Sequence, residues 1–450
     1  MIDLPLQFLL EACPGENVGV NPDQVYQRVC TDTRAVRPGD LFVALRGERF
    51  NGNAFAAAAL KAGAVAAVVD EPVDASPVLR VADARVAYGQ LAAAHRGEFD
   101  CPVFGVAGSN GKTSTKDMLA SVLGVERNVL RSEASFNNDV GVPATLLQLG
   151  PEHEAAVVEL GTNHPGELAP LVQMATPDYG VLTGIGREHL EFFGDLQGVA
   201  QEEGMLAELL PPRGKLFLYG DGDWVKPICQ RTRADVIRVG FGAANDWQVE
   251  TTRVEQGGTH FSIRAAESMW SGDYFTPLIG RHQAGNAALA LAAGAALGVG
   301  REALAQGLAA SPQPKQRLQW AESRGVRWLN DAYNANADSV RASLETLAAL
   351  ETAGRRFVVL GEMAELGVCA EDAHREAGEL TASAAAGLVA IGRLADVTAE
   401  GARVAGLKAV ESVPDVRAAV DVLRDWVQPR DVVLLKASRA AKLEQILDLF

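Results

Sequence analysis

The sequence predicts an α/β protein built from three domains. Short apolar runs of strand length alternate with helical patterns over most of its 450 residues, and this alternation is typical of parallel sheets covered by helices. The segment Ser311-Pro312-Gln313-Pro314 interrupts the series, because two prolines so close together break both helices and strands. The length also fits a chain of several domains, since one domain takes roughly 100–200 residues.

The first predicted domain, residues 1–83, is a small α/β unit. Its candidate strands are Asp40–Leu45 and Val65–Val69, and a turn rich in Gly, Asn and Phe projects from Gly47 to Phe55. We expect no signal peptide, because the apolar first ten residues contain an acidic side chain and no basic one.

The second predicted domain, residues 84–312, has a parallel sheet with an antiparallel excursion. Helical patterns occupy Thr113–Leu123 and about Ala284–Leu297. Near the second of these helices, Phe261 and Ile263 alternate with polar neighbours after a Gln-Gly-Gly turn, which is typical of an antiparallel hairpin. The candidate strands of the parallel sheet are Pro102–Ala107, Ala156–Leu160, Gly180–Ile185, Lys215–Tyr219 and Val236–Phe241.

The third predicted domain, residues 313–450, is a doubly wound, Rossmann-like domain. A second series of apolar runs alternates there with helical patterns, as in open parallel sheets with helices on both faces. Its candidate strands are Val326–Asn330, Phe357–Leu360, Leu388–Ile391 and Val432–Lys436.

Charge and composition exclude several classes of protein. The formal net charge of −16 argues against a nucleic-acid partner that is bound by phosphate neutralisation. The sequence contains no uninterrupted run of about 20 apolar residues, so we expect no membrane span. The 5 cysteines are scattered without a CxxC pair, which supports neither a disulfide framework nor a structural zinc site. We therefore expect a soluble, cytoplasmic enzyme.

The most specific local signal is a glycine-rich loop between a predicted strand and a predicted helix. It reads Gly105-Val-Ala-Gly108-Ser109-Asn110-Gly111-Lys112-Thr113-Ser114. In such a loop the backbone N–H groups converge on phosphate oxygens, the lysine reaches the terminal phosphates and the threonine hydroxyl faces Mg²⁺. The first glycine departs by one residue from the strict spacing, since Val106 stands where it is usual. The central domain is therefore predicted to be of the phosphate-loop type and to bind ATP.

Two further residues are candidate Mg²⁺ ligands. Glu159 ends an apolar strand, so its carboxylate is expected at the carboxyl edge of the sheet, beside the loop. His189 follows another strand end. Taken alone, the residues leave two interpretations of His189 open, a metal ligand or a structural histidine.

Several motifs, in their order along the chain, resemble the Mur ligase family, and the resemblance covers nearly the whole sequence. The Tyr-Asn-Ala-Asn run is the most discriminating of them within that family. The motifs are Thr33-Arg34, Gly39–Phe50, Asn137-Asn138-Asp139 with Gly141-Val142-Pro143, Glu159–Glu167, Gly280-Arg281-His282 with Asn286, Arg317-Leu318-Gln319, Asp331–Ser339 including Tyr333-Asn334-Ala335-Asn336, Leu360–Gly367 and Lys436–Arg439.

The resemblance implies an ATP-dependent amide ligase of peptidoglycan precursor synthesis. Its small-molecule substrates would be UDP-N-acetylmuramoyl-tripeptide and D-alanyl-D-alanine, and its cofactors ATP and Mg²⁺. ATP would phosphorylate the peptide carboxylate, and the amine of the dipeptide would displace phosphate from the acyl phosphate. The resemblance also suggests a monomer.

Residue roles follow from the same resemblance. Metal ligands would be Thr113, Glu159 and His189, with Lys112 and His189 acting in catalysis. ATP would be held by the loop from Gly108 through Ser114 and by His282, Asn286, Arg317 and Asp331. Substrate contacts would come from Thr33, Arg34, Asn137, Asn138, Tyr333, Asn334 and Asn336.

One departure from the family pattern matters chemically. Members of the family usually carry an Ala-Lys-Gly-Glu run whose lysine is carbamylated, and this chain reads Glu202-Glu203-Gly204-Met205. We expect the Glu203 carboxylate to supply the same oxygen charge near a second Mg²⁺, as a catalytic residue and without carbamylation. The alternative is a solvated helix charge. Other departures are Gly184 and Tyr219, where asparagines are usual.

Other functions remain open at this point. Another member of the superfamily, such as a folylpolyglutamate synthase or a cyanophycin-type ligase, would share the ATP chemistry. A nucleotide-switched binding protein would hydrolyse ATP without needing an amine substrate.

Overall fold

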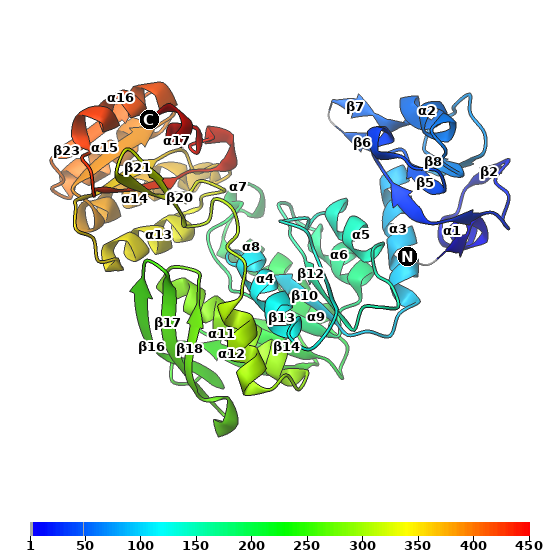
Figure 1. Cartoon of the computed structure of the whole chain (residues 1–450), viewed down its shortest axis with the longest axis horizontal. Coiled ribbons are helices and arrows are strands. Elements are labelled where there is room, and N and C mark those ends of the chain that lie inside the picture. Colours follow the sequence, from blue (N-terminus) through cyan, green and yellow to red (C-terminus); the bar gives the residue numbers. More distant parts are fainter. Residues whose placement is uncertain (1–2, 48) are drawn as a thin grey trace. The chain divides into compact units, whose positions relative to one another are not determined.

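The computed structural model describes residues 3–47 and 49–450, so Glu48 of the Gly39–Phe50 motif lies outside the described residues. The chain forms two compact units, which are described separately. The first comprises Met1–Gly105, Arg127–Gly161 and Glu167–Tyr179, and the second Val106–Glu126, Thr162–Gly166 and Gly180–Phe450. The elements are labelled in Figure 1.

The first unit begins with a five-stranded sheet in the order β2-β9-β8-β5-β4. All neighbours in it are parallel except β2, which is antiparallel to β9. Side chains of β5 alternate between two cores: Leu41 and Val43 pack into one, and Phe42 and Ala44 into the other. The elements are β1 (Leu4–Pro5), α1 (Leu6–Ala12), β2 (Glu16–Val18), β3 (Val25–Tyr26), β4 (Arg28–Cys30), η1 (Thr33–Ala35), β5 (Asp40–Val43), β6 (Arg46–Gly47), β7 (Phe50–Asn51), η2 (Gly52–Phe55), α2 (Ala56–Lys61), β8 (Ala66–Val69), β9 (Val78–Arg80) and α3 (Ala84–Gly97).

The remainder of the first unit contains β11, β12, α5, α6 and the first residues of β10. β11 and β12 are parallel, and the Ala156 amide of β12 donates to the carbonyl of Pro102 at 2.9 Å, next to the start of β10. All five residues of β12 are buried, as its apolar run predicts. The elements are β10 (Val103–Ala107), β11 (Val129–Arg131), α5 (Gly141–Leu146), β12 (Ala155–Glu159) and α6 (Leu168–Ala175).

In the second unit the strands lie in the order β13-β14-β15-β16-β17-β18. β14, β15 and β16 are parallel neighbours, whereas β16, β17 and β18 form antiparallel hairpins, which confirms the predicted excursion. The elements are α4 (Lys112–Leu123), β13 (Tyr179–Leu182), α7 (Leu190–Phe193), α8 (Leu196–Glu203), α9 (Met205–Leu209), β14 (Lys215–Tyr219), α10 (Val225–Cys229), β15 (Asp235–Gly240), β16 (Trp247–Glu255), β17 (Gly258–Ala265), η3 (Ser268–Trp270), β18 (Gly272–Thr276), α11 (Arg281–Ala296) and α12 (Arg301–Ala309).

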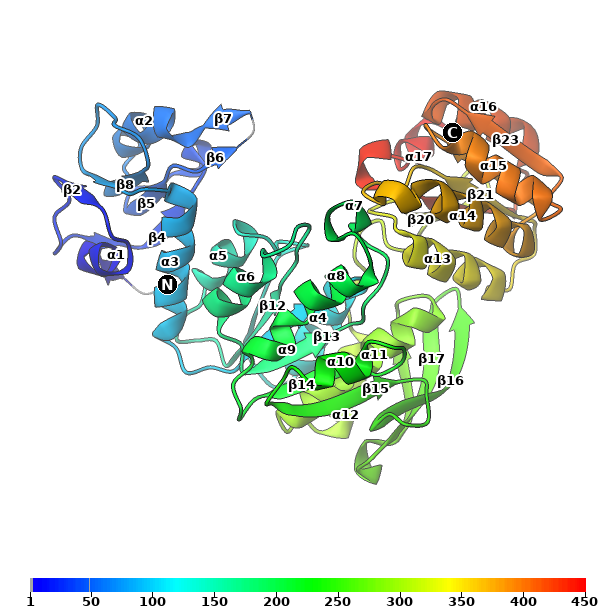
Figure 2. The same cartoon turned by 180° about the vertical axis from the view of Figure 1, so that it is seen from behind.

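The C-terminal part of the second unit is a doubly wound sheet in the order β19-β20-β24-β21-β22-β23. All its strands are parallel except β19, which is antiparallel to β20. In Figures 1 and 2, α13 and α14 lie on one side of β20 and β21, and α16 and α17 lie on the other. The elements are β19 (Gln319–Ser323), β20 (Val326–Asp331), α13 (Ala337–Ala349), β21 (Arg356–Leu360), η4 (Gly367–Cys369), α14 (Ala370–Ala384), β22 (Gly387–Ile391), α15 (Ala395–Val404), β23 (Ala409–Val413), α16 (Val416–Trp426), β24 (Val432–Lys436), η5 (Arg439–Ala441) and α17 (Gln445–Leu449).

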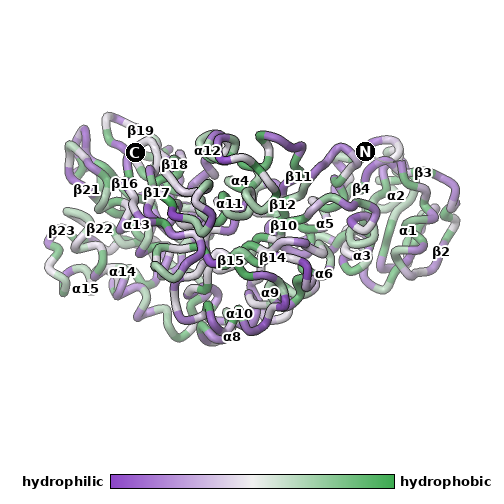
Figure 3. Tube along the Cα trace, turned by 90° about the horizontal axis from the view of Figure 1, so that it is seen from below, coloured by the Kyte–Doolittle hydropathy of each residue, from purple (hydrophilic) through white to green (hydrophobic). Residues whose placement is uncertain are grey.

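The side chains of β24 point alternately to the two faces of the sheet, which explains why helices cover both faces. Leu434 packs into the core formed with α13, α14 and α15, whereas Val433 and Leu435 pack into the core formed with α16 and α17. A strand that is apolar on both faces requires helices on both faces. Hydrophobic and hydrophilic stretches alternate along the whole trace in Figure 3. Within the described ranges, no helix combines the length and apolarity that crossing a bilayer requires.

The α/β class is confirmed, and the strands that sequence analysis missed are short or lie at sheet edges. β19 and β23 are edge strands with partly exposed side chains, so they lack the apolar run that marks a buried strand. The predicted strand Gly180–Ile185 ends earlier, at Leu182, and Gly184 has a φ of 127° that extended strands do not adopt. The predicted boundaries at residues 83 and 312 stay a prediction.

Leu434→Ala tests the packing that supports the C-terminal end of β24. The side chain is fully buried in a central strand, so we expect a loss of about 2–5 kcal/mol in the free energy of unfolding. Denaturant titration measures this loss. Val368→Ala is the control, because Val368 is 98% exposed and should change nothing measurable. Equal stabilities of the two variants would contradict the assigned core.

Candidate active site

The glycine-rich loop has the strand–loop–helix geometry that its sequence predicts. β10 ends at Ala107 and α4 begins at Lys112, and Gly108 and Gly111 adopt φ values of 116° and 85°. A Cβ at Gly108 would come within 2.8 Å of the Thr183 backbone nitrogen, and one at Gly111 within 2.5 Å of the Asn286 amide oxygen. Both positions therefore require glycine for conformation and for space. We call residues 108–113 the phosphate loop.

Lys112 and Thr113 lie at the start of α4, where backbone N–H groups and the helix dipole favour anions. Lys112 Nζ donates to the carbonyl of Gly108 at 2.6 Å and lies 3.7 Å from Glu188 Oε2. The hydroxyl of Thr113 accepts a hydrogen bond from Arg317 at 3.2 Å, and the Arg317 guanidinium stacks 4.4 Å from the centre of the Tyr333 ring. Residues predicted from three separate motifs thus meet at the loop.

Glu203 is a buried part of the phosphate loop's surroundings rather than a solvated helix charge. It has no exposed surface, and its Oε2 accepts the backbone N–H of Gly108 at 2.7 Å. Glu188, which sequence analysis missed, is also buried and is in contact with Glu203. Burial raises the pKa of both carboxyl groups, and the Lys112 ammonium opposes that rise. In the sequence, the feature that could have indicated a role for Glu188 is its position directly before the candidate ligand His189.

His189 is oriented by an acidic residue of the C-terminal motif Leu360–Gly367. Its Nδ1 forms a short hydrogen bond with Glu365 Oε2, and its Nε2 lies 3.8 Å from Glu188 Oε2. Burial lowers the pKa of the imidazole, which favours the neutral form. A neutral imidazole that is held at one nitrogen by a carboxylate is the usual arrangement of a metal-binding histidine.

Within the second unit, other polar bonds tie the C-terminal sheet to the loop. Asn336 begins α13 with a capping box and donates through its amide to Asn110 Oδ1 at 3.0 Å. Arg187 donates to Asp338 at 2.9 Å and to Glu376 at 2.7 Å. The hydrogen bond to Glu376 stabilises the charged guanidinium and so raises the pKa of Arg187. These pairs hold the Tyr333–Asn336 region beside the phosphate loop.

The residues expected on the nucleotide side occupy the start of α11 and the end of β20. Asn286 lies next to Gly111. Burial lowers the pKa of His282 to about 4, so this imidazole is neutral at pH 7. Asp331 pairs with Lys436 at 2.7 Å and accepts from the Ser343 hydroxyl at 2.6 Å. Asp331 thus already has strong protein partners.

The remaining predicted site residues belong to the first unit. Glu159 is buried, and its Oε1 accepts from the Asn137 amide at 2.9 Å. The amide oxygen of Asn138 accepts the backbone N–H of Gly141 at 2.9 Å at the start of α5. Thr33 and Arg34 lie in η1, where the exposed guanidinium of Arg34 pairs with Asp32 at 2.7 Å.

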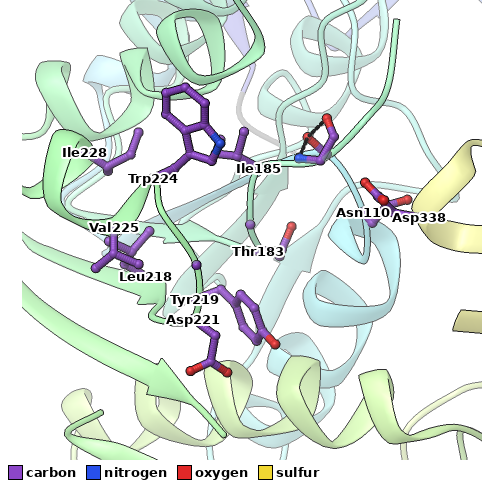
Figure 4. Close-up of a pocket in the computed structure, with 14 residues that line it drawn as sticks. Asn110, Thr183, Ile185, Leu218, Tyr219, Asp221, Trp224, Val225, Ile228 and Asp338 are labelled. Carbon is purple, nitrogen blue, oxygen red and sulfur yellow. Dashed lines mark hydrogen bonds between the residues drawn. The ribbon is translucent and has the colours of Figure 1, made fainter. Parts of the chain in front are cut away.

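A small cavity adjoins the phosphate loop, and Figure 4 shows side chains that line it. Its volume is about 230 Å³, and Asn110 and Trp224 are among its lining residues. The two family departures Gly184 and Tyr219 meet there, because a Cβ at Gly184 would contact the Tyr219 ring at 3.5 Å. At this distance a Cβ would make an ordinary van der Waals contact with the ring, and the φ of 127° at Gly184 is what favours glycine there.

The oxygen donors around the loop fit a hard cation such as Mg²⁺. The Oε1 atom of Glu203 is buried and has no hydrogen-bond partner, and the Thr113 hydroxyl lies at the start of α4. Among residues 3–47 and 49–450, no group of three His, Cys, Asp or Glu side chains is already placed to hold a metal. Mg²⁺ commonly takes only one or two carboxylates and completes its shell with phosphates and water.

A phosphate loop on a parallel sheet, with a doubly wound sheet bringing Arg317 and Asn336 to it, is the arrangement of an ATP-dependent ligase. The family model for the Mur ligase middle domain matches residues 106–294, that for the Mur ligase glutamate ligase domain residues 316–439, and that for the Mur ligase family catalytic domain residues 25–96. The chain belongs to the Mur ligase family.

Particular relatives share nearly the full length. The chain is 38% identical over 455 residues to the UDP-N-acetylmuramoyl-tripeptide–D-alanyl-D-alanine ligase of Escherichia coli, covering 99% of this chain and 98% of the relative. It is 35% identical to the ligase of the same name from Bacillus subtilis, covering 94% and 92%.

Solved structures agree in fold over the same length. The structure is similar to MurF from Acinetobacter baumannii, with a TM-score of 0.91 and 30% identity over 100% of this chain and 99% of that one. It is also similar to a MurF ligase from Thermotoga maritima in complex with ADP, with a TM-score of 0.83, 28% identity and coverage of 94% and 97%.

Gly111→Ala tests the geometry of the phosphate loop. The added methyl group would meet the Asn286 amide oxygen at 2.5 Å and occupy a left-handed conformation, so we expect ADP affinity, measured by calorimetry, to fall by roughly tenfold or more. Gly298→Ala is the matched control, because Gly298 has a similar φ of 78° with open space around its Cβ. An unchanged ADP affinity in Gly111→Ala would contradict the assignment.

Proposed function

We propose that this chain joins D-alanyl-D-alanine to UDP-N-acetylmuramoyl-tripeptide, with ATP as the energy source, in peptidoglycan precursor synthesis. The chain is 35% and 38% identical to two ligases of that name over nearly their full length, and this similarity supports the proposal. The single structural observation that carries it is the phosphate loop, with Lys112 at its centre and Arg317 at its threonine. Folylpolyglutamate synthase structures are only 18–20% identical and share the fold alone.

In the proposed reaction, the chain brings two anionic groups together, the phosphates of ATP and the tripeptide carboxylate, and lowers their mutual repulsion. The terminal phosphate of ATP is transferred to the tripeptide carboxylate, ADP leaves, and the amine of the dipeptide then displaces phosphate. Such transfer depends on positioning and charge neutralisation. Lys112, whose Nζ donates to the Gly108 carbonyl, would donate to a phosphate oxygen when ATP is bound, and Arg317 would screen the phosphates from the side of Thr113. These local cations offset the formal net charge of −16.

The proposed metal ligands are Thr113, Glu159, His189 and Glu203. When Mg²⁺ is bound, it neutralises phosphate charge and orients the terminal phosphate. The Glu365 hydrogen bond keeps His189 Nε2 directed away from the C-terminal motif. Buried Glu203 supplies a permanent carboxylate, so this chain needs no carbamylated lysine.

The remaining roles are proposals of the same kind. His282, Asn286 and Asp331 would contact the nucleoside, and Ser109, Asn110 and Ser114 the phosphates. Thr33 and Arg34 would bind the uridine diphosphate end, because Arg34 is an exposed cation. Asn137, Asn138, Tyr333, Asn334 and Asn336 would contact the peptide substrates. A cytoplasmic location and a monomeric state also remain predictions.

Phosphate release by the full chain is the assay that separates the proposed function from its alternatives. We expect release to require ATP, UDP-N-acetylmuramoyl-tripeptide and D-alanyl-D-alanine together, and Lys112→Ala to lower kcat by about 100-fold or more. Lys226→Ala is the control, because Lys226 is an exposed lysine on α10. Phosphate release without the amine would favour a nucleotide-switched ATPase, and release with another amine acceptor would favour another ligase of the superfamily.

A second prediction concerns Glu203 and bicarbonate. We expect Glu203→Ala to lose most of its ligase activity, because the variant removes a buried carboxylate at Gly108. Added bicarbonate should leave the rate of the unmodified chain unchanged and should raise that of Glu203→Lys. Initial rates with and without bicarbonate measure both effects. A fully active alanine variant would overturn the role assigned to Glu203.

A further inference from the structure

Glu188 and Glu203 place two carboxylates side by side next to the phosphate loop, and the proposed function uses only Glu203. Glu188 is 6% exposed and Glu203 is fully buried, and the two side chains are within hydrogen-bonding contact of each other. Glu188 follows β13 and Glu203 ends α8, so two separate segments bring them together. Two buried carboxylates in contact repel each other unless positive charge is shared between them.

The atoms around the two carboxylates indicate where a positive charge would be bound. Lys112 Nζ is 3.7 Å from Glu188 Oε2, while its hydrogen bond goes to the carbonyl of Gly108. Glu203 Oε2 accepts the N–H of Gly108, whereas Glu203 Oε1 is sealed from solvent and accepts no hydrogen bond from an N–H or a hydroxyl group. A buried carboxylate oxygen in this state is costly, and a bound cation removes the cost.

We propose that Glu188 and Glu203 together form a two-carboxylate site for a divalent cation at the phosphate loop. Glu188 is then a direct ligand that the motif comparison did not assign. The inference rests on the proposed function, because phosphate oxygens of the bound nucleotide complete the shell of the cation.

The chemistry of the pair favours a hard divalent ion. Its donors are carboxylate oxygens, which suit Mg²⁺ and Mn²⁺, and these ions commonly use two carboxylates together with phosphates. Glu203 accepts the N–H of Gly108, and Lys112, which donates to the carbonyl of the same residue, lies 3.7 Å from Glu188 Oε2. His189 Nε2, 3.8 Å from Glu188 Oε2, lies at the same point.

Mn²⁺ binding to the full chain tests the site without relying on activity. Free Mn²⁺ is measured by electron paramagnetic resonance, with and without ADP, for the unmodified chain and for Glu188→Gln and Glu203→Gln. We expect each variant to bind Mn²⁺ in the presence of ADP on the order of 10–100-fold more weakly. ADP affinity without metal is measured on the same samples.

Glu202→Gln is the matched control. Glu202 is the preceding residue on the same helix and is also buried, but its carboxylate accepts from the Gly166 amide at 2.8 Å. Its Mn²⁺ affinity should equal that of the unmodified chain. Glu188→Asp, which keeps the charge on a shorter arm, should lose less affinity than Glu188→Gln, and thermal unfolding checks that each variant is folded.

Three outcomes would overturn the inference. They are an unmodified chain that binds no Mn²⁺ beyond that held by ADP, a Glu188→Gln variant with unchanged affinity, and a Glu202→Gln variant that loses as much as Glu188→Gln. If the chain fails to bind ADP at all, the proposed function fails as well. Normal ADP binding with Glu188 dispensable for Mn²⁺ refutes this inference alone.

Discussion

The backbone of Gly108 is held from both sides, and the arrangement of the active site depends on that constraint. Its N–H donates to Glu203 and its carbonyl accepts from Lys112. A left-handed conformation and the nearby Thr183 backbone exclude any residue with a Cβ. Because the loop is fixed at this residue, the N–H groups that follow it stay directed toward one point, where phosphates bind. A carboxylate at the end of α8 and a lysine at the start of α4 thus fix the backbone of the loop at Gly108.

The local distribution of charge explains how a protein with an acidic net charge can bind anionic substrates. The cations near the loop come from distant parts of the second unit, Lys112 from α4 and Arg317 from the segment before β19. Buried Glu188 lies 3.7 Å from Lys112, and Arg317 is oriented by its hydrogen bond to the Thr113 hydroxyl. Asn336 and Arg187 hold the C-terminal sheet next to the loop through uncharged and charged bonds respectively. A surface with a formal net charge of −16 is therefore compatible with a local site for ATP.

Departures from the family pattern occur in neighbouring pairs. Gly184 lies beside the Tyr219 ring, and its φ of 127° favours glycine. Glu188 lies against Glu203, which stands where the family has a lysine. Packing and electrostatics both couple residues that are in contact, so a change at one position alters what its neighbour tolerates.

The sequence by itself determined the α/β class, the phosphate loop and the buried central strands, because these depend on local signals. Apolar runs mark buried strands such as β14 and β24, and glycine spacing marks the turn between β10 and α4. Edge strands such as β19 carried no such signal, since their side chains are partly exposed. Only the tertiary structure decided which polar side chains share a site. Glu188, Arg187 and Glu365 acquire their partners through contacts between segments far apart in the chain, and no local pattern records those contacts. The burial of Glu203, too, became visible only once α8 was packed against the loop, because solvent exposure is a property of the fold.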